Sequence, residues 1–194
     1  YKYREDEDYK KIQIDGYNAK VNTHSWVDTY AIRGLITYIN EYNPEVSFGL
    51  CHGTRRGIEQ QHFIDMFKRF LDKDVKVIGT EIAPDAADEF PNTIEWDFHD
   101  IKKEWVKNVD FIYSNSFDHS YKPEECLDTW MSCLNEKGLC IIEWTTDDEN
   151  DSRAMDPFAA SYDEYREMDM RSPLLIDFLD GEPTNHSLDN LRLL

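Results

Sequence analysis

Five short apolar segments, each ending in small or polar residues, follow one another at nearly even spacing through the middle of this chain. They end within the stretches 46–54, 79–82, 96–99, 110–119 and 138–144. Small residues at the carboxyl end of a strand let the backbone approach a ligand, and open α/β sheets bind their ligands at that edge. The repeated pattern therefore favours an enzyme with a nucleotide-like cofactor.

Helical patterns separate these segments. Apolar residues recur at helical spacing over about 25–41, again after the first turn, and once more from Pro123 until Gly138, where we expect the helix to end. Strands that alternate with helices form a mostly parallel sheet with right-handed crossovers. The sequence thus predicts an α/β, Rossmann-like fold with helices on both faces of the sheet.

The two ends of the chain are predicted separately. Residues 1–24 are charged and tyrosine-rich with weak periodicity, so we expect an irregular N-terminal arm. A helix near 161–170 and strands near 174–178 and 191–194 would complete a seven-stranded sheet. Residues 25–194 would then form a single domain.

The net charge bounds the choice of partner. Acidic residues outnumber basic ones by 40 to 21, which gives a formal charge of −19. A protein that binds nucleic acid needs a basic surface, and isolated pairs of Lys and Arg do not supply one. The charge argues against a nucleic-acid partner and favours a small or neutral one, although solubility alone also explains it.

The cellular compartment is predicted from sequence features that this chain lacks. No run of about 18 apolar residues predicts a membrane span, and no basic-then-apolar leader predicts secretion. The four cysteines lack the spacing of a zinc site or a disulfide framework, so we expect buried free thiols in a cytoplasmic protein. The start at Tyr1 rather than a methionine is expected of a processed product or of one domain of a longer protein.

Two acidic residues follow neighbouring strands at places suited to a nucleoside. Glu81 could accept two hydrogen bonds from a ribose diol, or it could cap a helix that begins at Pro84. Asp97 could accept from an exocyclic amine, with Phe98 flanking an adenine ring, or it could be a surface acid. The preceding turn is neither the GxGxxG of dinucleotide enzymes nor a phosphate-binding P-loop.

In order and spacing, the segments over about 45–145 resemble the class I S-adenosylmethionine-dependent methyltransferases. The resemblance is closest to the small-molecule, methyltransferase type 11-like branch, whose fourth motif has a His after the strand and a Pro a few residues on. Here these positions are His119 and Pro123. The stretch from Leu134 to Ile142 is similar to that family's approach to its fifth strand.

The resemblance implies S-adenosylmethionine as the cofactor and assigns residues to each part of it. It would place Gly49, Cys51, His52 and Gly53 at the methionine part, Glu81 with Ile82 at the ribose, Asp97 and Phe98 at the adenine, and Ser114, Asn115 and Ser116 near the sulfonium. The first turn departs from the family pattern. Its leading acid falls on Gly49, and its first and third glycines fall on Cys51 and Arg55.

A methyl transfer to a hydroxyl group needs a base near the end of the fourth strand. Asp118 and His119 are the candidate pair, because a carboxylate can orient a histidine that accepts the proton. A purely structural role at the rim is the alternative for His119, and His99 is a second candidate base. Carboxylates at Asp118, Glu143, Asp147 and Asp148 could instead hold Mg²⁺ or Mn²⁺, or form a solvated acidic loop.

The expected activity is methylation of a small-molecule hydroxyl group, with a carbohydrate as the preferred acceptor. Residues 1–24 and 145–172 would form the acceptor pocket, and His24 with Trp26 would be part of a lid. A noncatalytic, methyltransferase-like interaction domain of a larger protein is the alternative. A Rossmann-type oxidoreductase is disfavoured because the three-glycine turn is missing.

Overall fold

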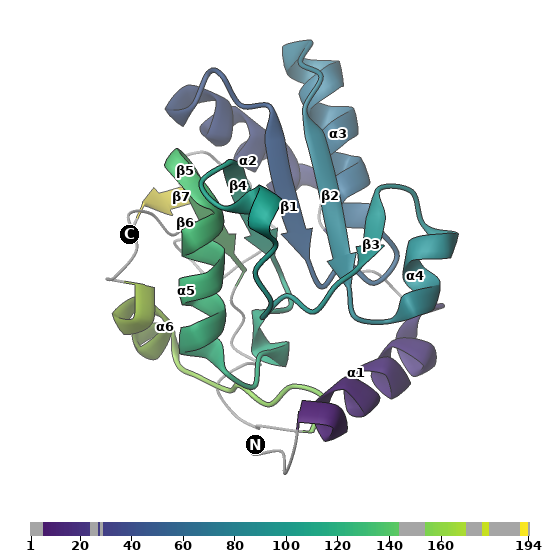
Figure 1. Ribbon diagram of the computed structural model, residues 1–194. Helices are drawn as coiled ribbons and strands as arrows, with labels where there is room; N and C mark the ends of the chain where they lie inside the picture. Colours follow the sequence, from purple (N-terminus) through teal and green to yellow (C-terminus); the bar gives the residue numbers. More distant parts are fainter. Residues whose placement is uncertain are drawn as a thin grey trace.

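The computed structural model describes residues 6–23, 27, 29–143, 154–169, 176–178 and 191–193. Five parallel strands form the main sheet, in the order β3-β2-β1-β4-β5 (Figure 1). The strands are β1 (Phe48–His52), β2 (Lys76–Glu81), β3 (Thr93–Glu95), β4 (Val109–Ser114) and β5 (Leu134–Ile142). The predicted mostly parallel α/β sheet is confirmed.

The helices are α1 (Asp6–Lys20), α2 (Thr29–Tyr42), α3 (Ile58–Leu71), α4 (Pro84–Glu89), α5 (Pro123–Cys133) and α6 (Tyr162–Asp169), with short 3₁₀ turns η1 (Lys103–Trp105) and η2 (Phe117–His119). Helix α5 covers one face of the sheet and α2 with α3 the other (Figure 1). The helices on both faces agree with the prediction.

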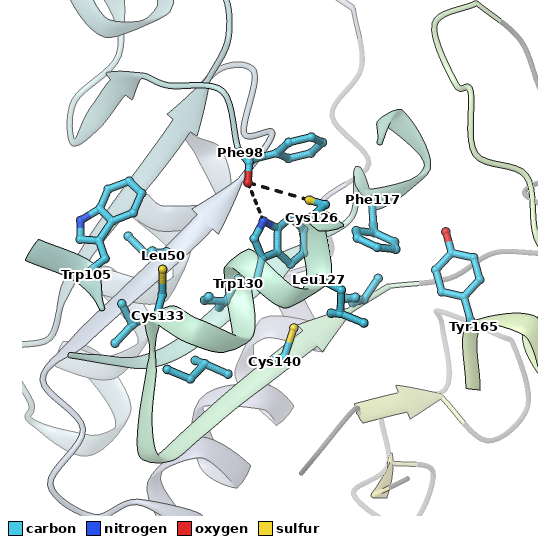
Figure 2. Packing of buried hydrophobic residues seen from close by; sticks show 14 of the residues in the cluster. Leu50, Phe98, Trp105, Phe117, Cys126, Leu127, Trp130, Cys133, Cys140 and Tyr165 are labelled. Atoms are coloured by element: carbon cyan, nitrogen blue, oxygen red, sulfur yellow. Dashed lines mark hydrogen bonds between the residues drawn. The ribbon is translucent and has the colours of Figure 1, made fainter. Parts of the chain in front are cut away.

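Successive residues of each strand point to opposite faces, which divides the core in two. Leu50 and Ile112 pack with Trp130 of α5 on one face (Figure 2). Phe111 packs with Phe63 of α3 on the other. Because both faces are covered, β4 is buried along its whole length and β5 is apolar over Leu139–Ile142, and such runs can be recognised in the sequence.

The direction in which successive strands are added to the sheet reverses at β1, although all strands stay parallel. From β1 the chain builds outward to β2 and β3, then returns to place β4 on the other side of β1. Such a switch point leaves a crevice beyond the carboxyl ends of the two central strands, where open α/β sheets bind ligands. The turn after His52 and the loop after Ser114 meet there.

A buried carboxylate joins the opposite, amino-terminal ends of the strands. Asp110 in β4 accepts hydrogen bonds from the backbone N–H groups of Ser47 and Phe48, each at 2.9 Å. It also accepts from the side chains of Asn43 at 2.9 Å and Asn135 at 2.7 Å, and from the Ser47 hydroxyl at 3.2 Å. One side chain thus fixes the start of β1 against β4 and β5.

Residues Asp6–Lys20 form the helix α1, so the expectation of an irregular lead-in was wrong for them. Tyr9, Gln13 and Tyr17 are buried and spaced four residues apart, so they form one face of α1. Two tyrosines and a glutamine make a weak apolar signal, which is why the sequence did not show it. Helix α1 lies beyond the carboxyl ends of the strands (Figure 1).

The C-terminal prediction holds only in part. Strands β6 (Ile176–Phe178) and β7 (Leu191–Leu193) exist, but they pair antiparallel in a two-stranded sheet of their own. Within the described residues, the seven-stranded sheet is therefore not confirmed. Helix α5 also ends at Cys133, and Gly138 lies inside β5 rather than at a helix end. A Cβ atom at Gly138 would lie 2.7 Å from the Leu134 Cβ, so close packing requires the glycine.

All four cysteines are free and buried, as predicted. Among the described helices, none combines the length and the apolar composition needed to cross a membrane.

Replacing Asp110 by asparagine should destabilise the fold by about 3 kcal/mol. Both carboxylate oxygens accept hydrogen bonds, and asparagine would put an NH₂ group, which can only donate, in place of one of them. Urea unfolding would measure the loss. Asp128→Asn, an exposed position in α5, is the matched control and should change stability by less than about 0.5 kcal/mol. Equal stability of the two variants would show that the Asp110 network is dispensable.

Candidate functional site

The turn after β1 is closed by backbone contacts. Gly53 has φ 73°, and both its N–H group and that of Thr54 donate to the Thr80 carbonyl, at 3.0 and 3.1 Å. The Ser116 hydroxyl donates to the Gly53 carbonyl at 3.2 Å. A Cβ atom at Gly53 would lie 2.7 Å from the Ser116 Cβ, so both the dihedral angle and the space require glycine.

The other residues predicted for this turn lie within β1. A Cβ atom at Gly49 would lie within 2.2–2.7 Å of the Phe111 ring, so an acid cannot stand there without moving the ring. Cys51 and His52 are buried. The side chains of Cys51 and His52 therefore belong to the core, and contact of these three residues with a cofactor stays a prediction for their backbone.

His52 is a neutral core residue. Its Nδ1 atom hydrogen-bonds with the Thr80 hydroxyl at 2.8 Å, and its ring stacks on Trp130 with centroids 4.7 Å apart. Burial lowers the pKa of His52 from 6.5 to about 3, and His99 contributes in the same direction. The imidazole is therefore uncharged at neutral pH.

Glu81 braces the first turn from β2. Its Oε2 atom accepts from the Arg55 N–H at 2.9 Å, and its Oε1 atom accepts from the N–H groups of Ile82 at 2.8 Å and Ala83 at 3.4 Å. Burial raises the pKa of Glu81, although these N–H groups oppose the rise. Ile82 and Ala83 precede α4, so these bonds hold the approach to the helix, and a capping role for Glu81 stays a prediction. Oε2, with one bond, still has a second lone pair for a ligand hydroxyl.

Asp97 is held by His99. Its Oδ1 atom accepts from the His99 backbone N–H at 3.1 Å and from Nδ1 at 2.7 Å, while His99 Nε2 hydrogen-bonds with the Ser120 hydroxyl at 2.9 Å. Burial acts to raise the pKa of Asp97, but His99 outweighs it and the net direction is downward. His99 is thus a partner of Asp97, tied between two side chains.

Phe98 is anchored in the core next to this pair. Its carbonyl accepts from Trp130 Nε1 at 2.8 Å and from the Cys126 thiol at 3.8 Å (Figure 2). Its ring makes edge contacts with His52, His99 and Trp130. The ring is buried, so its position is set by packing whether or not an adenine ring lies beside it.

The loop after β4 is tied to the turn after β1. The Ser114 hydroxyl donates to the His52 carbonyl at 3.0 Å and accepts from the Ser116 N–H at 3.1 Å. Asn115 Oδ1 accepts from the Ser116 hydroxyl at 3.2 Å. The structure therefore brings these three residues to the Gly53 turn, while their predicted place near the sulfonium of a cofactor stays a prediction.

His119 is held by two segments that sequence reasoning did not connect to it. Gln13 of α1 donates its amide N–H to the Met155 carbonyl at 2.7 Å, which turns its Oε1 atom toward His119. Oε1 can only accept, so His119 Nδ1, at 2.7 Å, carries the proton. His119 Nε2 then faces Asp156 Oδ1 at 3.4 Å.

Asp118 completes this group. One atom each from Asp118, His119 and Asp156, of the kind that could bind a metal ion, lies within 4.8 Å of the other two. Burial raises the pKa of Asp118 against the opposing charge of His119, and Asp156 adds to the rise. Sequence adjacency revealed the Asp118–His119 pair, but no local signal points to Asp156 or Gln13.

The carboxylates expected to share a metal ion are not gathered as predicted. Asp118 groups with His119 and Asp156, whereas Glu143 accepts a hydrogen bond from the Tyr113 hydroxyl at 2.9 Å. Asp147 and Asp148 lie outside the described residues, as do His24 and Trp26 of the expected lid.

Comparison with known protein families gives no match, and no curated protein matches the chain. A structure of the plantazolicin methyltransferase BpumL in complex with SAH has a TM-score of 0.55 and 14% identity, covering 93% of this chain and 79% of BpumL. A second BpumL complex, with a pentazolic desmethylPZN analog and SAH, has a TM-score of 0.55 and 15% identity, covering 86% and 72%.

The sugar N-methyltransferase KedS8 from Streptoalloteichus sp ATCC 53650 has a TM-score of 0.48 and 16% identity over 71% of this chain, which spans 56% of the KedS8 structure. At these identities the two BpumL comparisons, and not the KedS8 comparison, establish the fold alone. The chain has the fold of the class I S-adenosylmethionine-dependent methyltransferases.

The neutral state of His52 predicts a pH effect on stability. The unfolded chain takes up a proton near pH 6.5 and the folded chain only near pH 3, so stability is lost as the pH falls below 6.5. From pH 7.5 to 5.5, the wild type should lose about 1.4 kcal/mol more than His52→Gln. Urea unfolding at several pH values would measure this difference, and parallel curves would contradict it.

Proposed function

We propose that this chain is an S-adenosylmethionine-dependent methyltransferase that modifies a small-molecule hydroxyl group, with a carbohydrate as the preferred acceptor. The observation that carries the proposal is the meeting of four strand ends at one edge. The Gly53 turn, Glu81, Asp97 and the loop of Ser114 to Ser116 follow β1, β2, β3 and β4 in that order. The fold shared with BpumL supports it.

The side chains at this edge fit such a cofactor. Buried oxygen atoms of Thr54 in the first turn, of Glu59 just after it, and of Tyr17, which packs against Ala83 and Ala86, have no hydrogen-bond partner among the described residues. Buried polar atoms normally have partners, so these three suit a polar ligand. Glu81 would accept the ribose hydroxyls and Asp97 the adenine amine.

When bound, S-adenosylmethionine supplies an electrophilic methyl group. His119 would act as the base: Nδ1 donates to Gln13, so Nε2 is the atom that accepts the proton of the acceptor hydroxyl. Asp156, 3.4 Å from Nε2, would stabilise the resulting imidazolium, and Asp118 adds negative charge beside it. The same acids would serve an amine acceptor, so the acceptor atom has to be measured.

The binding part of the proposal predicts micromolar affinity for S-adenosylhomocysteine by calorimetry. Glu81→Ala should weaken it at least about tenfold, by loss of the ribose acceptor and of the brace on the turn. Asp85→Ala, an exposed position in the first turn of α4, is the control and should leave affinity unchanged. Absence of binding to the wild type would instead favour a noncatalytic interaction domain.

The catalytic part predicts that His119→Gln lowers the methyl-transfer rate by about 10²–10⁴-fold while affinity for S-adenosylhomocysteine stays within about twofold. Glutamine can keep the contact to Gln13 but cannot take up the proton. His62→Gln, on α3, is the control. The assay would present sugars, amino sugars and small peptides, and methylation of an amine alone would contradict the hydroxyl preference.

A chelator separates the two roles open to the His119 group. With His119 as the base, EDTA should leave the rate unchanged. If EDTA abolished the rate and Mg²⁺ or Mn²⁺ restored it, Asp118, His119 and Asp156 would be metal ligands rather than a base and its partners.

A further inference from the structure

Glu59 is a buried carboxylate in the first turn of α3, directly after the glycine-containing turn. Its side chain is 6% exposed, and its Oε2 atom has no hydrogen-bond partner among the described residues. A buried polar atom without a partner is costly, so such an atom needs a reason. None of the contacts described above accounts for it.

The groups around Glu59 are mostly acidic. Glu81 from β2 and Glu143 from the end of β5 act on it as like charges, and Arg55 from the turn is the opposing cation. Cys51 of β1 and Tyr113 of β4 face it from the sheet. Burial raises the pKa of Glu59 to about 7.

The polar groups around Glu59 already form hydrogen bonds with other residues. The Tyr113 hydroxyl donates to Glu143, and Arg55 Nη1 donates to the Lys20 carbonyl at 3.0 Å and the Thr23 hydroxyl at 3.0 Å. Glu81 accepts from three backbone N–H groups. Three carboxylates beside one guanidinium leave an excess of negative charge, which favours a cationic ligand group.

We propose that Glu59 receives the ammonium group at the amino-acid end of S-adenosylmethionine. This inference rests on the proposed function. It assigns a cofactor-binding role to Glu59, for which the sequence analysis predicted none. The turn after β1 has no carboxylate of its own, and Gly49 has no room for one. An ammonium group brings three N–H donors to the unpartnered oxygen, whereas the sulfonium brings none.

The same contact makes binding proton-linked. Near pH 6, free Glu59 is largely protonated, because the acids around it and its burial disfavour the charge. An ammonium ion lowers the pKa of the carboxyl group it contacts, so ligand binding should release a proton. Calorimetry in two buffers that differ in ionisation enthalpy measures this release without any turnover.

The experiment compares S-adenosylhomocysteine with its desamino analogue, in which hydrogen replaces the ammonium group. The wild type should bind the amine at least about tenfold more tightly than the analogue and release close to one proton at pH 6. Glu59→Gln should bind both ligands about equally, with no proton release. Asp65→Asn, the same change at an exposed site on α3, should behave like the wild type.

The outcomes separate the two proposals. A wild type that binds neither ligand overturns the proposed function and this inference together. A wild type that binds S-adenosylhomocysteine, with unchanged affinity and proton release in Glu59→Gln, overturns the inference alone. Equal weakening of both ligands in Glu59→Gln also overturns it, because a structural role would not distinguish the amine. The unliganded variant should be no less stable at pH 8, since it removes a buried negative charge that lies near two other carboxylates.

Discussion

Asp110 connects segments that are distant in the sequence: the end of α2, the start of β1 and the start of β5. Its five hydrogen bonds lie at the amino-terminal ends of the central strands, away from the candidate site. Because the strands are parallel, fixing their starts also fixes where they end. The turn after His52 and the loop after Ser114 meet at the opposite edge as a consequence.

That edge is assembled mainly from backbone groups held by side chains. Glu81 holds the N–H groups of Arg55 and Ile82, Ser116 holds the Gly53 carbonyl, and Asp97 holds the His99 N–H. Residues that the family resemblance assigns to a ligand are thus already structural here. A carboxylate can hold a backbone N–H group and also accept from a ligand, because each of its oxygens has two lone pairs. Ligand affinity then depends on the geometry of the turns that these carboxylates hold.

The sequence predicted the central strands best where both faces of the sheet are covered, as in β4 and in Leu139–Ile142 of β5. The prediction from sequence failed for α1, whose buried face consists of the polar or amphipathic side chains of Tyr9, Gln13 and Tyr17. It also failed at Gly138, which allows close packing inside β5 and does not end a helix. The candidate site divides in the same way. Asp118 and His119 are neighbours in the sequence, but the hydrogen bond from His119 to Gln13 spans 106 residues and has no local signature.

The tether on His119 has a consequence for how acceptor choice and catalysis are connected. Gln13 belongs to α1 and Asp156 to the segment 154–160, which also docks on η2 through the Phe158 N–H and the Asp118 carbonyl at 3.0 Å. Both elements fall in the stretches predicted to form the acceptor pocket. The tautomer and orientation of His119, the proposed base, therefore depend on the segments that would contact the acceptor under the proposed function. Substitutions that reshape those segments should alter proton transfer together with acceptor binding, because the sheet alone does not position the imidazole.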